Sequence, residues 1–276
     1  MSKPLVVLKV GGDMLHDAAE REGLAANVRA LVDHGARVVV VHGGGPQVNA
    51  LQEKVGLTPV KVAGRRITGK DDLVVVTQAI CGEVNVALTA LLVRAGVRAF
   101  GCHGASAALI RATRRPPKIM PGAGDAPIDF GLVGDVTSVD GALLSSLVAL
   151  DVVPVIATLG IDDTGQVLNI NADTTVAAVA RAISADLLLM ITKVGGVFTN
   201  IDDASTRIPS LDRAQAARLI EEGTISGGMI PKVEEALATL DAGVKSVAIV
   251  SALESASFVA AMTGNERSGT RFVRAT

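Results

Sequence analysis

The amino-acid sequence predicts an α/β fold, a three-layer α/β/α sandwich with a mainly parallel central sheet and two lobes. Short runs of Val, Ile and Leu alternate with longer helical patterns along the 276 residues, which is typical of parallel strands joined by right-handed crossovers. Trp and Tyr are absent and glycine occurs 29 times, so we expect an aliphatic core of buried strands. The lobes are expected to comprise residues 1–162 and 163–276.

In the first half of the chain, glycine and proline residues separate the apolar runs. Gly35 ends the first helical pattern, and Pro46 begins the second, where the missing N–H of proline costs no hydrogen bond. The expected elements are a strand at 4–10, a helix at 19–34, a strand at 36–42, a helix at 46–55, a hairpin within 57–68, a helix at 70–95, a strand at 97–104, an irregular stretch at 104–137 that holds one strand at 128–136, and a helix at 142–150.

The second half repeats the alternation of strands and helices. Its first strand, DVVPVIATLG, is an unbroken apolar run of the kind that is buried on both faces. The expected elements are a strand at 151–160, a helix from about 171, a strand at 186–194, helices at 213–222 and 231–242, a strand at 245–251, a short helix at 254–262 and a strand at 269–275.

Composition and charge exclude several classes of protein. The 26 basic and 28 acidic residues nearly balance, so neither a nucleic acid nor a membrane surface is an expected partner. Cys81 and Cys102 match no metal or redox spacing, and reduced thiols indicate a cytoplasmic protein. The apolar run in MSKPLVVLKVGG is too short for a signal peptide, and no later stretch approaches the about 20 apolar residues of a membrane span.

Glycine-rich turns follow two of the expected strands. KVGG contains Gly11 and Gly12, and HGGG contains Gly44 and Gly45. Such turns let backbone N–H groups approach an anion, although they are also common as purely structural turns. Neither one matches a P-loop or a dinucleotide fingerprint. Ligands of open parallel sheets bind beyond the carboxyl ends of the strands, where these turns lie.

Two lysines and one aspartate stand at positions where their charge is unexpected. Lys9 ends an apolar strand, and Lys232 lies in the first turn of a helix, where the helix dipole disfavours a cation. Asp173, in NINAD, stands at the start of an apolar helix and could simply cap it. Either lysine could likewise simply extend its ammonium group into solvent. Taken together, the three charges and the glycine turns predict a phosphoryl-transfer site, where lysines neutralise the moving phosphoryl group.

The motifs KVGG, HGGGPQVN, GRRIT, NINAD and GGMIPKV, in this order, resemble those of the amino acid kinase family over essentially the whole chain. The resemblance implies the fold of that family and an ATP-dependent phosphorylation of the γ-carboxylate of N-acetyl-L-glutamate, a step of arginine biosynthesis. It also implies that Lys9 and Lys232 stabilise the transferring phosphoryl group and that Asp173 holds these lysines in place.

The resemblance implies the remaining binding residues as well. Gly44 and Gly45 would donate backbone N–H groups to the substrate, Arg66 would pair with a substrate carboxylate, and Asn169 would contact the acetylglutamate. Mg²⁺ would be held by the phosphates, with no metal site on the protein. Gly11 and Gly12 would lie against the phosphates of ATP, and the rest of its site would be lined by Lys193, Val194, Gly195, Gly196, Val197, Phe198, Ser226, Gly227, Gly228 and Met229.

Three positions depart from the usual family pattern. Lys193 replaces a common aspartate near the nucleotide, and Gly69 and Ser106 replace acidic residues near the substrate. Arginine-inhibited members carry an N-terminal helix that assembles hexamers. Few residues precede the first strand here, so we expect a homodimer without strong arginine feedback. A PII-type regulator binds some members, but no feature of this sequence indicates such a surface.

Two other functions remain open from the sequence. One is a kinase of the same family that phosphorylates a carrier-linked aminoadipate, for which the basic run RATRRPPK, otherwise expected as a mobile loop, could dock an acidic carrier. The other is a catalytically silent sensor of ATP or an amino acid. The presence of Lys9, Asp173 and Lys232 argues against the sensor, and NINAD with HGGGP favours free acetylglutamate.

Overall fold

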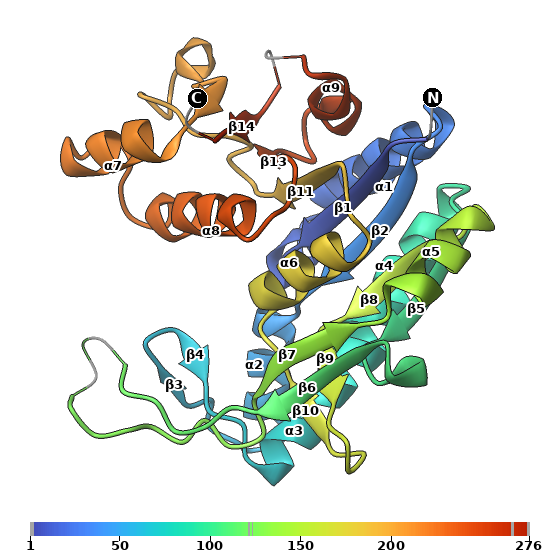
Figure 1. The fold of residues 1–276 in the computed structure, drawn as a ribbon, viewed down its shortest axis with the longest axis vertical. Coiled ribbons are helices and arrows are strands. Elements are labelled where there is room, and N and C mark those ends of the chain that lie inside the picture. The colour runs from blue at the N-terminus through green and yellow to red at the C-terminus, as the bar shows by residue number, and fades with distance from the viewer. Residues whose placement is uncertain (1–2, 121, 123, 266–267, 275–276) are drawn as a thin grey trace.

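A single large sheet runs through the molecule in a computed structural model that describes residues 3–120, 122, 124–265 and 268–274. Its strand order is β12-β14-β13-β11-β1-β2-β8-β5, and every neighbouring pair is parallel except β13 and β14 (Figure 1). This confirms the predicted mainly parallel α/β fold. The strands are β1 (Leu5–Val10), β2 (Arg37–His42), β5 (Ala99–His103), β8 (Val153–Ala157), β11 (Leu187–Ile191), β12 (Ser210–Leu211), β13 (Val247–Val250) and β14 (Thr270–Phe272).

Helices cover both faces of this sheet because its side chains alternate between them. Val6 and Leu8 point into one core with α1, α4 and α9, whereas Val7 points into the other core with α5, α6 and α8. The helices are α1 (Ala18–Asp33), α2 (Gly45–Lys54), α3 (Lys70–Thr77), α4 (Asn85–Arg94), α5 (Gly141–Ala149), α6 (Ala172–Ala182), α7 (Arg213–Glu221), α8 (Met229–Asp241) and α9 (Ser257–Thr263).

The helical run Lys70–Arg94 is continuous, because a π-helical turn at Gln78–Val84 joins α3 to α4. Among the described residues it is the one helix that is long and apolar enough to cross a membrane by length and composition alone. The sequence prediction found no such stretch because polar residues interrupt this run. Its side chains Ile80, Leu88 and Leu92 are buried in the protein cores, so we interpret it as a core helix.

A second, four-stranded sheet lies below the first one in the order β10-β9-β6-β7 (Figure 1). Its strands are β6 (Ile110–Arg114), β7 (Gly134–Val139), β9 (Leu159–Ile161) and β10 (Val167–Asn169), and a short hairpin of β3 (Lys61–Val62) and β4 (Arg65–Arg66) projects beside it. Three short 3-10 turns, η1 (Gly12–Leu15), η3 (Ser106–Ala108) and η4 (Ala204–Thr206), complete the described elements.

The prediction of an irregular stretch at 104–137 is wrong in its first part. Ile110 and Ala112 alternate into the core and make β6, so the first half of RATRRPPK is a strand instead of a mobile loop. Arg115 is buried, bonds Asp135 at 2.5 Å and lies over the Phe130 ring. The strand expected at 128–136 begins only at residue 134.

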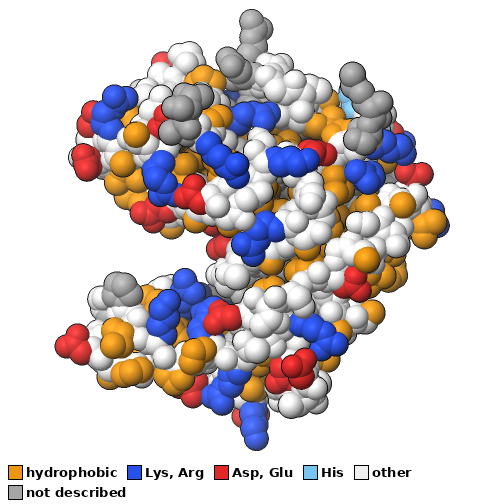
Figure 2. Space-filling model, viewed as in Figure 1, with side chains coloured by type: hydrophobic (Ala, Val, Ile, Leu, Met, Phe, Trp, Pro, Cys, Tyr) orange, Lys and Arg blue, Asp and Glu red, His pale blue; other side chains and the backbone are white. Residues whose placement is uncertain are grey.

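The division into lobes at residue 162 stays a prediction. β9 and β10 form an antiparallel hairpin that spans this position, so β10 belongs by its pairing to the sheet of the N-terminal half. The C-terminal half, with α7, α8 and β12–β14, lies above a broad hollow, and the second sheet with its hairpin lies below it (Figures 1 and 2).

Candidate active site

The hollow between the two halves contains a pocket of about 640 Å³ (Figure 2). Arg65 contributes from the β3–β4 hairpin below, and Asn171 and Asp173 contribute from the start of α6. Pro231 and Glu235 contribute from α8 above. Three elements that are far apart in the sequence therefore meet at the carboxyl ends of the parallel strands, where ligands of such sheets bind.

Lys9 reaches this site from the carboxyl end of β1. Its Nζ lies 2.7 Å from Oδ1 of Asp173, and its side chain is only 20% exposed. Burial lowers the pKa of Lys9, but the carboxylates of Asp173 and Glu235 outweigh this and raise it. The ammonium group is therefore charged at neutral pH. The structure thus brings together two of the three residues predicted for phosphoryl transfer.

Asp173 is free to hold Lys9 because another residue caps its helix. The side chain of Asn171 accepts hydrogen bonds from the backbone N–H groups of Asp173 and Thr174, at 2.8 and 3.1 Å. Burial raises the pKa of Asp173, but the charge of Lys9 outweighs it and keeps the pKa below its ordinary value. Simple capping by Asp173, the alternative left open by the sequence, is therefore wrong.

Lys232 lies in the first turn of α8, as predicted, and the structure shows that it is half-buried. The contact between α8 and the Lys9–Asp173 pair is made by Glu235, whose Oε1 lies 3.8 Å from Lys9 Nζ. Burial, with the nearby charge of Asp173, raises the pKa of Glu235 to about 8 although Lys9 opposes the rise. Glu235 was missed in the sequence, where no signal separates it from the adjacent Glu234.

The two glycine turns pack against each other. A Cβ on Gly12 would lie 2.8 Å from the Cα of Gly44, and Gln47 Nε2 donates a hydrogen bond of 2.7 Å to the Gly12 carbonyl. His42, fully buried, donates from Nδ1 to the Gly43 carbonyl, and burial lowers its pKa to about 4. A neutral histidine therefore fixes the start of the second turn, and it does not serve as an acid at neutral pH.

The predicted substrate residues share a second, smaller pocket of about 190 Å³. Gly45, Arg66 and Asn169 all line it, together with Arg65 and Arg115. The Arg66 guanidinium is held in place by the side chains of Gln52 and Asn49 on α2. Gly44 is not among the lining residues and packs against Ile80 and Val84. The pocket is thus rich in fixed cations, which suits a substrate with carboxylates.

The two segments predicted to bind ATP meet around a cavity of about 320 Å³. Most of the predicted residues line it: Val194, Gly196, Val197, Phe198, Ser226 and Met229. Gly227 and Gly228 lie beside it in the turn before α8. The cavity borders the same end of the large sheet as the pocket between the halves, because α8 contributes to both of them.

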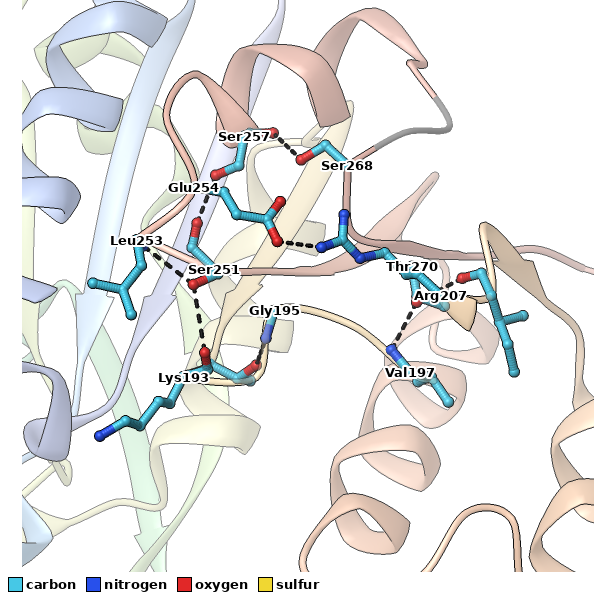
Figure 3. Close-up of polar contacts among 12 residues, drawn as sticks. Lys193, Gly195, Val197, Arg207, Ser251, Leu253, Glu254, Ser257, Ser268 and Thr270 are labelled. Atoms are coloured by element: carbon cyan, nitrogen blue, oxygen red, sulfur yellow. Dashed lines mark hydrogen bonds and ion pairs between the residues drawn. The ribbon is translucent and has the colours of Figure 1, made fainter. Parts of the chain in front are cut away.

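The loop after β11 that lines this cavity is anchored from the edge of the sheet (Figure 3). Val197 N–H donates to Thr270 Oγ1 at 2.8 Å, and Ser251 Oγ donates to the Lys193 carbonyl at 3.5 Å. Gly195 has φ +76°, and a Cβ there would meet Ser251 at 2.4 Å. The Lys193 side chain points away from the loop in Figure 3, and its Nζ lies 3.8 Å from Glu20.

Residues 4–251 match the sequence profile of the amino acid kinase family. The chain belongs to the amino acid kinase family. An acetylglutamate kinase from Anaeromyxobacter dehalogenans is 47% identical over 96% of this chain and 98% of its own. An acetylglutamate kinase from Sorangium cellulosum is 43% identical over 90% and 87%, respectively. A solved structure from Streptococcus mutans UA159 is 31% identical, covers 89% of this chain and 94% of its own, and has a TM-score of 0.71.

Membership of this kinase family implies that ATP is the phosphoryl donor. Among the described residues, no group of three or more His, Cys, Asp or Glu side chains is placed to hold a metal ion. Three cationic groups come from three separate elements: Lys9 and Lys232 both act on Glu235, and Arg66 lines the smaller pocket. An amino acid kinase with this arrangement can hold a polyphosphate on one side and an acidic acceptor on the other.

Proposed function

We propose that this amino acid kinase transfers the γ-phosphoryl group of ATP to the γ-carboxylate of N-acetyl-L-glutamate, forming N-acetyl-L-glutamyl 5-phosphate in arginine biosynthesis. The observation that carries the proposal is the Lys9–Asp173 pair, which the fold places at 2.7 Å in the hollow between the two halves. The acetylglutamate kinases at 47% and 43% identity over nearly whole chains support the choice of substrate.

The reaction needs charge neutralisation and alignment more than proton transfer. The acceptor carboxylate is already a nucleophile, so no general base is required. Lys9 and Lys232 neutralise charge on the transferring phosphoryl group, and Asp173 keeps Lys9 charged and aimed into the hollow. Mg²⁺, held by the phosphates, would supply further charge neutralisation. Gly11 caps η1 and Gly12 begins it, directly after β1, and we propose that they offer backbone N–H groups to the phosphates.

The acceptor is positioned by the smaller pocket. The Arg66 guanidinium, fixed by Gln52 and Asn49, is the partner we propose for the α-carboxylate, because its planar fork matches a carboxylate in two hydrogen bonds. Asn169 donates to Thr68 Oγ1 at 3.0 Å, which orients its amide at the rim of the pocket. Gly44 and Gly45 complete this part of the proposed site.

The cavity lined by Val194, Phe198 and Met229 is the proposed site for the nucleoside of ATP. In this arrangement residues 1–162 chiefly bind the amino-acid substrate and residues 163–276 chiefly bind ATP. Lys193 is expected to contribute little, because its ammonium faces Glu20. We also propose a cytoplasmic location, because the acetylglutamate kinase relatives that support the pathway are enzymes of amino-acid biosynthesis.

A homodimer is the proposed assembly. Phe100 lies on β5, the edge strand of the large sheet, and is 50% exposed. Val86 and Val93 lie two turns apart on the neighbouring helix α4 and are 61% and 53% exposed. An open edge strand beside exposed apolar side chains favours association. Light scattering coupled to size exclusion tests the proposal, and a monomer or a hexamer would contradict it.

A carrier-linked aminoadipate kinase has less support from the structure than from the sequence. Its basis was a free basic loop, whereas Arg114 lies in β6 and pairs with Asp129, and Arg115 is buried against Asp135. A silent sensor would not need the close pairing of Lys9 with Asp173 that the fold maintains.

The test is the rate of ADP release with MgATP and four acceptors: N-acetyl-L-glutamate, glutamate, aspartate and N-acetyl-aminoadipate. Fast turnover with N-acetyl-L-glutamate alone would support the proposal. Turnover only with N-acetyl-aminoadipate would indicate that an aminoadipate is the acceptor. Nucleotide binding without turnover would favour the sensor.

A further inference from the structure

Glu235 holds a carboxyl group against the two charges of the proposed transfer site. It lies on α8 one turn after Lys232, its side chain is 19% exposed, and its Oε1 is 3.8 Å from Lys9 Nζ. That oxygen is buried and has no hydrogen-bond partner among the described residues. The Glu235 carboxyl is also within hydrogen-bonding reach of Asp173. The roles that the family resemblance implies do not include Glu235.

Two carboxyl groups within hydrogen-bonding reach of each other, such as those of Glu235 and Asp173, do not both ionise easily, because like charges in a buried site repel each other. They share one proton, and the pair titrates as a unit. Asp173 lies closer to Lys9 and keeps its charge, so the proton resides on Glu235, whose pKa is raised to about 8. The charged groups that act on Glu235 are Lys9 from β1, Asp173 from α6 and Lys232 on its own helix. Arg65 and Glu234 line the same pocket, and the charge of Asp13 in η1 acts on Lys9.

We propose that Glu235 is a positioning residue of the transfer site, which ties helix α8 to the Lys9–Asp173 pair and so sets the place of Lys232 relative to Lys9. The proposal rests on the proposed function for its catalytic meaning. Lys232 and Glu235 occupy adjacent turns of one rigid helix, so a contact that fixes the carboxyl also fixes the start of the helix. Among the described residues, Glu235 is the one residue of α8 that forms an ion pair with Lys9.

The same contact makes the site sensitive to pH. Below about pH 8 a neutral Glu235 keeps its proton and donates a hydrogen bond to Asp173, and the pocket carries one negative charge fewer where the triphosphate binds. Above that pH the Glu235 carboxylate repels both Asp173 and the phosphates, and it competes with them for Lys9. Lys9 itself does not titrate in this range because its pKa is raised. Nucleotide binding should therefore weaken as Glu235 ionises.

The experiment compares Glu235→Gln, which mimics the neutral carboxyl, with Glu235→Ala, which removes it. Glu221→Gln, on the exposed side of α7, is the matched control. Affinity for MgATP is measured by calorimetry between pH 6 and 9.5, and kcat is measured at pH 7. For the wild type and the control we expect the Kd to rise on the order of tenfold from pH 7 to pH 9.

The variants separate the two parts of the proposal. Glu235→Gln should keep kcat within about threefold and lose the rise in Kd, whereas Glu235→Ala should lower kcat at least about tenfold at every pH. An unchanged rise in Kd for Glu235→Gln, or equal kcat for the wild type and Glu235→Ala, would overturn the inference. Because nucleotide affinity needs no acceptor, the test stands even where the proposed acceptor fails. A Glu235→Ala protein that does not fold leaves the Glu235→Gln titration decisive.

Discussion

Replacing Asp173 by Asn tests most sharply how the site is built. The amide has nearly the size of the carboxylate, and Asn171 continues to cap α6, so the helix start is preserved. What is lost is the negative charge that lies 2.7 Å from Lys9 Nζ. If Asp173 holds Lys9 in place for the phosphoryl group, the loss appears in kcat far more than in the KM for ATP.

The expected magnitudes follow from burial. Breaking a fully buried ion pair costs about 3–5 kcal/mol, and an exposed pair contributes about 0–1 kcal/mol. Lys9 is 20% exposed and Asp173 is 36% exposed, and Glu235 remains as a second carboxyl for Lys9, so we expect a loss of about 1–2 kcal/mol in the free energy of unfolding. A misplaced donor to the transition state costs about 3–4 kcal/mol, which lowers kcat on the order of 100-fold to 1000-fold.

The assay is steady-state ADP release with saturating N-acetyl-L-glutamate, alongside urea unfolding of the same protein. Asp140→Asn is the matched control, because Asp140 caps α5 through its side chain away from the site. The control should retain the activity of the wild type. A kcat for Asp173→Asn within about threefold of the wild type would refute the role given to Asp173.

Four further results are expected. Gly12→Ala should lower both stability and activity, by about 1–3 kcal/mol in stability, because its Cβ would lie 2.8 Å from Gly44. Arg66→Lys should raise the KM for N-acetyl-L-glutamate about 10-fold to 100-fold with a smaller change in kcat, since the charge stays but the fork is lost. Lys193→Ala should change the KM for ATP less than about twofold. The pKa of His42 is lowered to about 4, so stability should fall by up to about 3 kcal/mol as pH drops from 6.5 to 4, and His42→Gln should remove this slope.

Each result has a clear contrary outcome. A Gly12→Ala enzyme with full activity would show that the two glycine turns can separate freely. Equal KM values for Arg66→Lys and the wild type would place the substrate carboxylate elsewhere. A large rise in the KM for ATP with Lys193→Ala would show that this side chain turns toward the nucleotide. A His42→Gln protein with the same acid slope would assign that slope to other groups.

The sequence predicts most of the large sheet, because its longer strands are mainly apolar runs and glycine-rich turns follow β1, β2 and β11. It also predicts that Lys9 and Asp173 meet, since charges at the ends of parallel strands and at helix starts gather at one edge of the sheet. The short strands are harder to predict. β6 holds two arginines in five residues, and only the alternation of Ile110 and Ala112 indicates that it is a strand.

Glu235 shows why part of the site needs the fold. In the sequence it is one of two adjacent glutamates on an amphipathic helix, and nothing there distinguishes it from Glu234. Only the packing of α8 beside β1 and α6 turns its carboxyl toward Lys9. The side chain of Lys193 is a similar case, because its direction depends on a loop that is anchored by Ser251.

The most direct test of the proposed reaction is to identify its product. N-acetyl-L-glutamate, MgATP and the protein are incubated with hydroxylamine, which converts an acyl phosphate into a stable hydroxamate. We expect hydroxamate to form in equal amount to ADP, and only when both ATP and the acceptor are present. ADP release without hydroxamate, or hydroxamate formation at the same rate by Asp173→Asn, would contradict the proposed transfer to a carboxylate by Lys9 and Asp173.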